Sequence, residues 1–377
     1  MSKILSCPTP AVVIDLDRVT ANIAKAQAHA DTHGMRLRPH IKTHKLPRFA
    51  KAQMEAGAIG ITCQKLGEAE VMADAGLTDI FLPYNIMGAD KLARLKALAE
   101  RVQMSVTADN APTVDGYAAT FSKNAPLTVL VECDTGMGRC GVQTPAEALE
   151  MAKHIAAAPG LTFGGLMTYP DTNRHAEAER WLADAVQVLA DAGLPAETVS
   201  SGGTPGMWHT PSSVVTEYRP GTYIYFDRSQ VAAGVATYAD CALVVRTTVI
   251  SRPTPDRAII DAGSKALTSD LLGLEGYGYV LTYPEAAITA LSEEHGIVDL
   301  SKCDTRPEIG DVIEIIPNHA CPVSNLYDFV YLSTGGRIID HLKENLGNPA
   351  TDILFVGYQA HGTPGRDILT YAPRKNG

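Results

Sequence analysis

The stretch Arg38-Pro39-His40-Ile41-Lys42-Thr43-His44-Lys45 places five basic or imidazole side chains within eight residues. It follows an apolar–polar alternation at Met35 and Leu37 and precedes a helix-like run, Leu46 to Ala56. A strand that ends in a lysine and continues into a loop is where an α/β barrel carries catalytic groups. Lys42 is therefore a candidate Schiff-base lysine. Taken alone, such a charge run is more often a solvated basic loop or a phosphate-binding patch. The choice between these interpretations and a catalytic lysine depends on the rest of the chain.

Short β-like runs alternate with helix-like runs through the first part of the chain. Strands that alternate with helices indicate βαβ units and a parallel sheet, and eight such strands predict a (β/α)8 barrel. An open doubly wound sheet is the alternative, which the lack of a GxGxxG fingerprint after the first strand disfavours. The eight predicted barrel strands are Met35–Pro39, Ala58–Cys63, Asp79–Pro83, Gln103–Thr107, Leu127–Cys133, Leu161–Thr168, Glu197–Ser201 and Pro220–Phe226. The predicted helices include Val19–His33 with Asp17 as its cap and Gly34 as its stop, Lys65–Ala75, Ala89–Arg101, Pro145–Ala158 and Ala176–Ala192.

After about residue 235 the pattern changes to β-like runs punctuated by Pro and Gly, at Cys241–Ser251, Ala258–Ile260 and Asp311–Ile316, with a helix-like stretch only at Gly336–Glu344. The predicted domains are a barrel over residues 1–235 and a β-rich domain over residues 236–377, with the first residues as candidates to pack with the second domain.

Composition excludes several classes of protein. The chain has 377 residues and a net charge of -10, which argues against sequence-independent nucleic-acid binding. No apolar run approaches the roughly 20 residues that span a bilayer. The first residues do not have the pattern of a signal peptide. Seven scattered cysteines without a CxxC pair indicate free thiols in a reducing cytoplasm.

Polar groups follow the predicted strands at the positions where a barrel places its active site. A nest of backbone N–H groups between Ser201 and Thr204 would suit a phosphate, although a glycine-rich turn is more often only a turn. A lysine, such a phosphate cup, an arginine and a tyrosine together describe a pyridoxal phosphate site. The candidate residues are Lys42, Gln64, Arg139, Tyr169, Ser201, Gly202, Gly203 and Thr204, with Gly221, Thr222 and Tyr223 at the start of the predicted eighth strand.

A second constellation is Pro317-Asn318-His319-Ala320-Cys321-Pro322, which directly follows a predicted strand. His319 and Cys321 would present two ligands suited to zinc or a similar divalent ion, with His295 as a candidate neighbour. An isolated His-x-Cys is more often a buried cysteine beside a hydrogen-bonded histidine. A third patch, Asp261 to Leu267, is either an ordinary polar turn or a source of Asp261 or Lys265 at the barrel mouth.

The chain resembles the D-threonine aldolase and eukaryotic-type D-serine dehydratase family, which has the alanine racemase fold. The resemblance runs from about Pro8 to Leu369. It rests on the Lys42 octapeptide, Gln64-Lys65-Leu66-Gly67-Glu68-Ala69-Glu70, Asp134-Thr135-Gly136-Met137-Gly138-Arg139-Cys140-Gly141 and the His319–Cys321 motif. It implies Lys42 as the Schiff-base lysine, Arg139 near the cofactor's phenolic oxygen, and the Ser201–Thr204 and Gly221–Tyr223 backbones around its phosphate. It also implies a zinc, manganese or magnesium ion on His319 and Cys321, a D-amino acid substrate and a homodimer.

The resemblance leaves two lyase reactions open, and the aldolase interpretation leads. An aldolase would cleave D-3-hydroxy-amino acids to glycine and an aldehyde. A dehydratase would convert D-serine or D-3-hydroxyaspartate to a 2-oxo acid and ammonia, with Lys42 as the base that removes the α-proton. His-x-Cys resembles the dehydratase metal pair, whereas Pro170 stands where many aldolases have a histidine base, which leaves His40, His44, His175 and His209 as substitutes. An amino-acid racemase would share Lys42 but would not need the metal pair, and a non-catalytic carrier of the cofactor would not need the β-rich domain.

Overall fold

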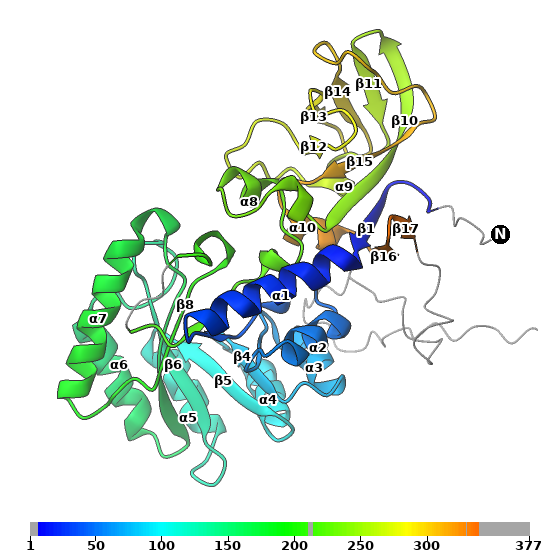
Figure 1. The fold of residues 1–377 in the computed structure, drawn as a ribbon. Helices are drawn as coiled ribbons and strands as arrows, with labels where there is room; N and C mark the ends of the chain where they lie inside the picture. Colours follow the sequence, from blue (N-terminus) through cyan, green and yellow to red (C-terminus); the bar gives the residue numbers. More distant parts are fainter. Residues whose placement is uncertain (1–6, 210–213, 329, 339–377) are drawn as a thin grey trace, which may run out of the picture. The chain divides into compact units, whose positions relative to one another are not determined.

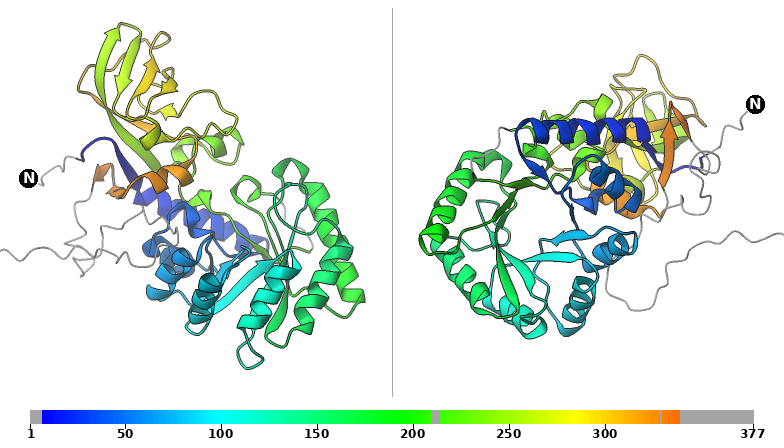
Figure 2. Two further views of the ribbon diagram at one scale, coloured as in Figure 1. Left: turned by 180° about the vertical axis from the view of Figure 1, so that it is seen from behind. Right: turned by 60° about the horizontal axis from the view of Figure 1, so that its bottom comes forward.

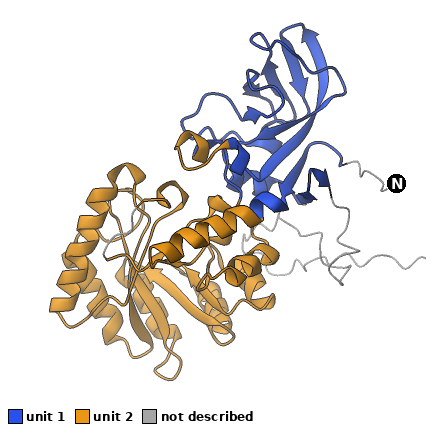
Figure 3. Cartoon of the chain, viewed as in Figure 1, with its two compact units in different colours: residues 1–19, 225–229, 238–377 blue, residues 20–224, 230–237 orange. Residues whose placement is uncertain are grey.

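The computed structural model describes residues 7–209, 214–328 and 330–338. They form two compact units, shown in Figure 3. The barrel unit holds residues 20–224 and 230–237, and the β-rich unit holds the described residues before 20, residues 225–229 and the described residues from 238 onward.

Eight parallel strands form the sheet of the barrel unit in the order β2-β9-β8-β7-β6-β5-β4-β3. A parallel bridge between His40 and Thr62, with the hydrogen bond from Ile59 N to Leu37 O, joins the two ends of this order and closes the barrel. Phe81, Leu130 and Met167 form a buried cluster contributed by β4, β6 and β7. The strands are β2 Arg36–Leu37, β3 Ile61–Thr62, β4 Asp79–Leu82, β5 Gln103–Ala108, β6 Leu127–Cys133, β7 Leu161–Thr168, β8 Thr198–Ser201 and β9 Glu217–Tyr218.

Helices follow the strands and surround the sheet (Figure 2). Local sequence explains where they begin. In α6 the Thr144 hydroxyl accepts from Glu147 N, and the Glu147 carboxylate accepts from Thr144 N, which is a reciprocal capping box. The helices with residues in this unit are α1 Leu16–Thr32, α2 Pro47–Glu55, α3 Leu66–Asp74, α4 Ala89–Ala99, α5 Ala111–Thr120, α6 Pro145–Ala157, α7 His175–Asp191 and α8 Arg228–Ala232.

The predicted barrel is confirmed, with three local corrections. The eighth strand is β9 at Glu217–Tyr218 and not Pro220–Phe226, whose centre forms the 3-10 turn η4 Thr222–Ile224. Pro220 and Gly221, which come just beyond Arg219, end the strand earlier than the apolar residues of this segment indicate. The helix α1 is capped by Asp15, whose Oδ1 accepts from the N–H groups of Asp17 and Arg18, so Asp17 lies in the first turn. Helix α5 was not among the helices named from the sequence.

The β-rich unit is built on the long strand β10 (Figure 1). This strand pairs antiparallel with β1, β11 and β15, and β1 also pairs parallel with β16. The strand β1 therefore precedes the barrel in the sequence but belongs to the β-rich unit. The strands are β1 Ala11–Asp15, β10 Leu243–Thr254, β11 Arg257–Ile260, β12 Tyr279–Val280, β13 Ala287–Leu291, β14 Gly296–Asp299, β15 Val312–Ile316, β16 Val330–Thr334 and β17 Arg337–Ile338.

Two short helices complete the β-rich unit, α9 Ser264–Leu267 and α10 Ala320–Leu326. The predicted helix Gly336–Glu344 is wrong at its start, since Arg337–Ile338 is the strand β17, and its residues from 339 lie outside the described part of the chain. None of the helices in the described ranges is long and apolar enough to cross a membrane.

Candidate active site

Lys42 lies in the 3-10 turn η1, Ile41–Thr43, which follows β2 at the carboxyl end of the barrel. His40 caps this turn, because its Nδ1 accepts from Lys42 N at 3.3 Å. The same ring donates from Nε2 to Gln64 Oε1 at 3.0 Å, so its proton resides on Nε2. Burial and the nearby charge of Lys42 hold the pKa of His40 well below its ordinary value. A neutral histidine therefore fixes the backbone of the candidate Schiff-base lysine.

Gln64 is held in turn by Glu68, the third residue of α3. The Glu68 carboxylate accepts from Gln64 N at 2.7 Å and from Lys65 N at 3.3 Å, which caps the helix. The side chain of Gln64, predicted to contact the cofactor, bonds to His40 in the structure. Gln64 thus belongs to the support of the Lys42 turn.

The structure brings together the two segments predicted to surround a phosphate. Thr204 Oγ1 accepts from Gly221 N at 3.2 Å and from Tyr223 N at 3.1 Å, which joins the loop after β8 to the loop after β9. The Gly221–Tyr223 segment was predicted at the start of a strand and instead follows the strand's end, which is the side where a barrel places its active site. The Tyr223 ring is buried and accepts a hydrogen bond from Gln53 Nε2, so only its backbone faces this loop pair.

Three glycines leave no room for side chains in these loops. A Cβ on Gly221 would lie 3.1 Å from His40 O, and a Cβ on Gly203 would lie 2.9 Å from the Tyr169 ring. Gly202 has a φ of +85°, and a Cβ there would lie 2.4 Å from the Tyr218 ring. The backbone at these positions, called the glycine cradle below, is therefore bare of side chains, and at Gly221 it lies against the Lys42 turn.

Arg139 and Tyr169 lie together, since the Arg139 guanidinium is 5.2 Å from the Tyr169 ring centre. Arg139 is more than half exposed, and its Nη2 is 3.8 Å from Oε1 of the buried Glu132. Burial raises the pKa of Glu132, and the charges of Arg139 and Arg219 oppose that rise. The loop that presents Arg139 is organised by Asp134, whose Oδ1 accepts from Gly136 N and Gly138 N at 3.0 Å each.

A largely buried ionic network, which the sequence did not indicate, joins residues at the ends of β2, β8 and β9. Arg219 donates from Nε to Ser200 Oγ at 3.0 Å and from Nη2 to Thr168 O. Ser200 donates to Glu217 at 2.6 Å, and Glu217 also accepts from Arg38 Nε at 3.1 Å. Burial lowers the pKa of Arg219 to about 10. Only the positions of these residues could have indicated the network. Arg219 directly follows β9 and Ser200 lies near the end of β8, and residues at the carboxyl ends of barrel strands gather at one face.

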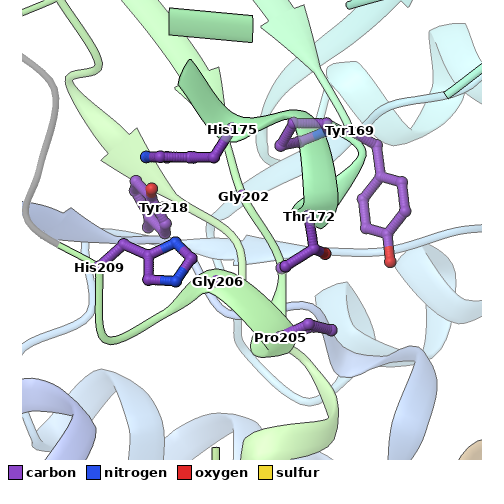
Figure 4. Close-up of a pocket in the computed structure, with 10 residues that line it drawn as sticks. Tyr169, Thr172, His175, Gly202, Pro205, Gly206, His209 and Tyr218 are labelled. Atoms are coloured by element: carbon purple, nitrogen blue, oxygen red, sulfur yellow. The ribbon is translucent and has the colours of Figure 1, made fainter. Parts of the chain in front are cut away.

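A pocket next to the glycine cradle contains two of the substitute bases (Figure 4). The ring centres of His175 and His209 lie 5.0 Å apart, and both residues line the same pocket as Gly202 and Gly203. His44 is a different case, because its fully buried ring packs edge-on against Phe49 and burial lowers its pKa to about 3. The pocket is lined by Tyr169, Pro170, Thr172, His175, Gly202, Gly203, Pro205, Gly206, His209 and Tyr218.

The His319–Cys321 motif lies in the β-rich unit, at the start of α10. His319 Nδ1 is 2.6 Å from Asp270 Oδ2, in the loop after α9. Asp227 Oδ2 accepts from Ala320 N at 2.9 Å and fixes the backbone between the two candidate ligands. Burial lowers the pKa of His319, but Cys321, Asp270 and Asp227 raise it to about 9. The surroundings of this histidine are therefore anionic and suit a cation.

The other candidates in the β-rich unit have structural partners. His295 is exposed in the turn between β13 and β14, and no group of three metal-ligating side chains forms among the described residues, so His295 is not a third ligand. Asp261 accepts from Thr247 Oγ1, Thr248 N and Thr9 Oγ1. Lys265 is exposed and pairs with Glu293 and Glu294. The third patch is thus an ordinary polar turn.

Comparison with known families assigns both units. The alanine racemase N-terminal domain family matches residues 14–229, and a putative serine dehydratase domain matches residues 242–333. A Beta-Casp domain also matches residues 332–368, of which 339–368 lie outside the described residues.

Relatives of known activity cover nearly the whole chain. It is 35% identical over 348 residues to a D-threonine aldolase of an Arthrobacter species, with 88% of this chain and 90% of that protein covered. It is also 35% identical over 352 residues to a D-threo-3-hydroxyaspartate dehydratase of a Delftia species, with 84% and 92% covered.

Solved structures agree with these relatives. The D-threonine aldolase of Filomicrobium marinum superposes with a TM-score of 0.81 at 32% identity and covers 93% of this chain and 95% of its own. A cysteine-to-alanine mutant of D-threo-3-hydroxyaspartate dehydratase, in a metal-free form, gives 0.80 at 31% identity and covers 90% of this chain and 98% of its own.

The chain belongs to the alanine racemase N-terminal domain family, within the group that contains the D-threonine aldolases and the D-serine and D-3-hydroxyaspartate dehydratases. The resemblance and the fold inferred from the sequence are confirmed, and the protein is a pyridoxal phosphate-dependent lyase.

Proposed function

We propose that this protein cleaves D-3-hydroxy-amino acids, in the manner of a D-threonine aldolase, to glycine and an aldehyde. The observation that carries the proposal is that one chain contains two sites. The barrel unit has a lysine, Lys42, beside the glycine cradle, and the β-rich unit has the His319–Cys321 turn in anionic surroundings. The relatives with the names D-threonine aldolase and 3-hydroxy-D-aspartate aldolase support it.

The barrel residues fit pyridoxal phosphate. Lys42 Nζ would join the cofactor, and the backbones of Ser201–Thr204 and Gly221–Tyr223 would hold its phosphate. Arg139, with Tyr169 beside it, would contact the ring's phenolic oxygen. When bound, the cofactor supplies an electron sink for cleavage of a bond at the substrate's Cα. The neutral His40 keeps the Lys42 turn in place without adding another positive charge to it.

The His319–Cys321 turn fits a divalent metal by its donor chemistry. Imidazole nitrogen and thiolate are ligands typical of zinc and related ions, and two protein ligands leave positions open for water or substrate. Such an ion would supply a Lewis acid at the substrate's β-hydroxyl. The metal-free form described for a cysteine mutant of a relative supports a metal role for the cysteine here. Zinc, manganese and magnesium all remain candidates.

The proton of the β-hydroxyl needs an acceptor, and the structure narrows the choice of histidines. His44 is fully buried against Phe49, and His40 uses both ring nitrogens in hydrogen bonds. His175 and His209, which line the pocket beside Tyr169, are the remaining candidates for holding this proton. Water on the metal is the alternative acceptor.

A dehydratase that gives a 2-oxo acid and ammonia is the second candidate function. It is favoured by Pro170, which leaves the pocket without a histidine at that position, and by the dehydratase of Delftia at 35% identity. Lys42 Nζ would then remove the substrate's α-proton.

Product analysis tests the proposal. The purified protein is incubated with pyridoxal phosphate and Mn²⁺ or Zn²⁺ and, in separate reactions, with D-threonine, D-serine and D-3-hydroxyaspartate. Glycine with an aldehyde is the expected result. A 2-oxo acid with ammonia would establish the dehydratase instead, and L-amino acid as the only product would establish a racemase.

The proposal includes a homodimer working in the cytoplasm, as the resemblance implies. Light scattering of the purified protein tests the dimer, for which twice the chain mass of 40.1 kDa is the expected result.

A further inference from the structure

One contact in the β-rich unit adds negative charge beside His319 and has no further role in the function proposed above. The Asp270 carboxylate lies 2.6 Å from His319 Nδ1, although the two residues are 49 positions apart in the sequence. Their side chains are 38% and 29% exposed, so the contact lies at the margin of the unit and not in its core. An ion pair in such a position contributes little to the stability of a fold.

The loop that carries Asp270 is built to hold it. Asp270 N donates to Thr268 Oγ1 at 2.8 Å, and Thr268 itself has a φ of +62°, which is unusual for a β-branched residue. At the other end of the loop, Asn318 Nδ2 donates to Gly276 O at 2.8 Å. The residue next to His319 therefore anchors the same loop that supplies the carboxylate.

The contact decides which imidazole nitrogen is available to a ligand. A carboxylate accepts hydrogen bonds, so His319 Nδ1 must carry a proton and Nε2 is the atom left for coordination. Metal-binding histidines commonly donate their second N–H to a carboxylate, which fixes the ring's tautomer and orientation. Asp270 faces Nδ1, and it does not form a three-ligand group with His319 and Cys321 among the described residues.

We propose that Asp270 is a positioning residue of the metal centre, which orients His319 through Nδ1 so that Nε2 coordinates the ion. The inference rests on the metal site of the proposed function. It adds a carboxylate outside the coordination sphere whose loss weakens metal binding without removing a ligand. Loss of a partner of this kind typically lowers metal affinity about 10- to 100-fold.

Titration of the metal-stripped full-length protein with Co²⁺ tests the inference directly. A thiolate-to-cobalt charge-transfer band reports coordination by Cys321 and needs no substrate and no turnover. The variants are Asp270→Leu, which lacks an acceptor, and Asp270→Asn, which retains a carbonyl oxygen that can accept from Nδ1. Ser269→Ala, at the exposed neighbouring position of the same loop, is the matched control.

The expected result is wild-type cobalt affinity for Ser269→Ala, a loss of about 10- to 100-fold for Asp270→Leu, and substantial recovery in Asp270→Asn. Equal affinities for Asp270→Leu and the wild type would overturn the inference. So would Asp270→Asn binding as weakly as Asp270→Leu, since the effect would then be one of charge and not of orientation. Melting temperatures of the metal-free variants show whether each one folds.

The outcome for His319→Ala separates this inference from the proposed function. Wild-type cobalt binding by that variant would contradict the metal site itself. Loss of binding in His319→Ala with no change in Asp270→Leu would leave the proposed metal site intact and contradict only the role of Asp270.

Discussion

Around Lys42 the barrel unit gathers cations and a neutral histidine, whereas around His319 the β-rich unit gathers carboxylates and a thiol. His40 is buried beside Lys42 and its pKa is depressed, while the pKa of His319 is raised to about 9. The same type of side chain is therefore an uncharged cap in one unit and lies among anionic groups in the other. The comparison shows that the field around a histidine decides what it can hold: the barrel surroundings suit an anionic phosphate, and the turn at α10 suits a metal ion.

The largest effect is expected at Lys42. Replacing it by Ala removes the amine that would join the cofactor, and activity should fall by at least about 10³-fold. The visible absorbance band of the lysine-bound cofactor should disappear, while the metal content stays at the wild-type value because His319 and Cys321 lie in another unit. Spectroscopy and metal analysis of one preparation check both. A surviving band would show that another residue holds the cofactor.

Metal removal should affect the metal site and leave the cofactor site intact, which is the reverse of the effect of Lys42→Ala. Dialysis against a strong chelator should abolish lyase activity and leave the cofactor band unchanged, and Mn²⁺ or Zn²⁺ should restore the activity. If lyase activity is unaffected by chelation, the His–Cys turn has no part in the reaction.

The two regions also differ in how much they contribute to stability. Glu217 is buried and accepts from Ser200 and from Arg38, which also pairs with Asp79, so Glu217→Leu removes the carboxylate that offsets the charge of the buried Arg219. The free energy of unfolding should fall by about 3–5 kcal/mol. Asp270→Leu, at a partly exposed site, should lower it by less than about 1 kcal/mol. Urea denaturation of the metal-free proteins measures both, and similar losses for the two variants would contradict the distinction.

The effect that is smallest at neutral pH, and grows only in acid, concerns His44, whose pKa is lowered to about 3 by burial. The unfolded chain binds a proton near pH 6.5 and the folded chain does not, so stability is lost as pH falls from about 6.5 towards 3. This residue should contribute a slope of up to about 1.4 kcal/mol per pH unit within that window. In His44→Gln the unfolding free energy should depend less on pH than in the wild type. If the unfolding free energies of the wild type and His44→Gln, measured by urea denaturation, change equally with pH, the pKa of His44 is the same in the folded and unfolded chains and the prediction is wrong.

The sequence by itself determined the barrel, because strand and helix periodicity are local properties of the chain. It also determined the lysine, the glycine loops and the His-x-Cys pair, since each is a short run of neighbouring residues. It did not determine the end of the last barrel strand, where apolar residues continue past Tyr218 but Pro220 and Gly221 end the pairing.

Only the tertiary structure decided which distant residues complete each site. The Arg219–Ser200–Glu217–Arg38 network joins the ends of several strands, and Asp270 reaches His319 across 49 positions. The sequence predicts Gln64 as a cofactor contact, and only the structure shows that its side chain also bonds to His40. The physical reason is that hydrogen bonds and ion pairs depend on atomic distances, and the spacing of residues along a chain does not specify the distances that folding creates.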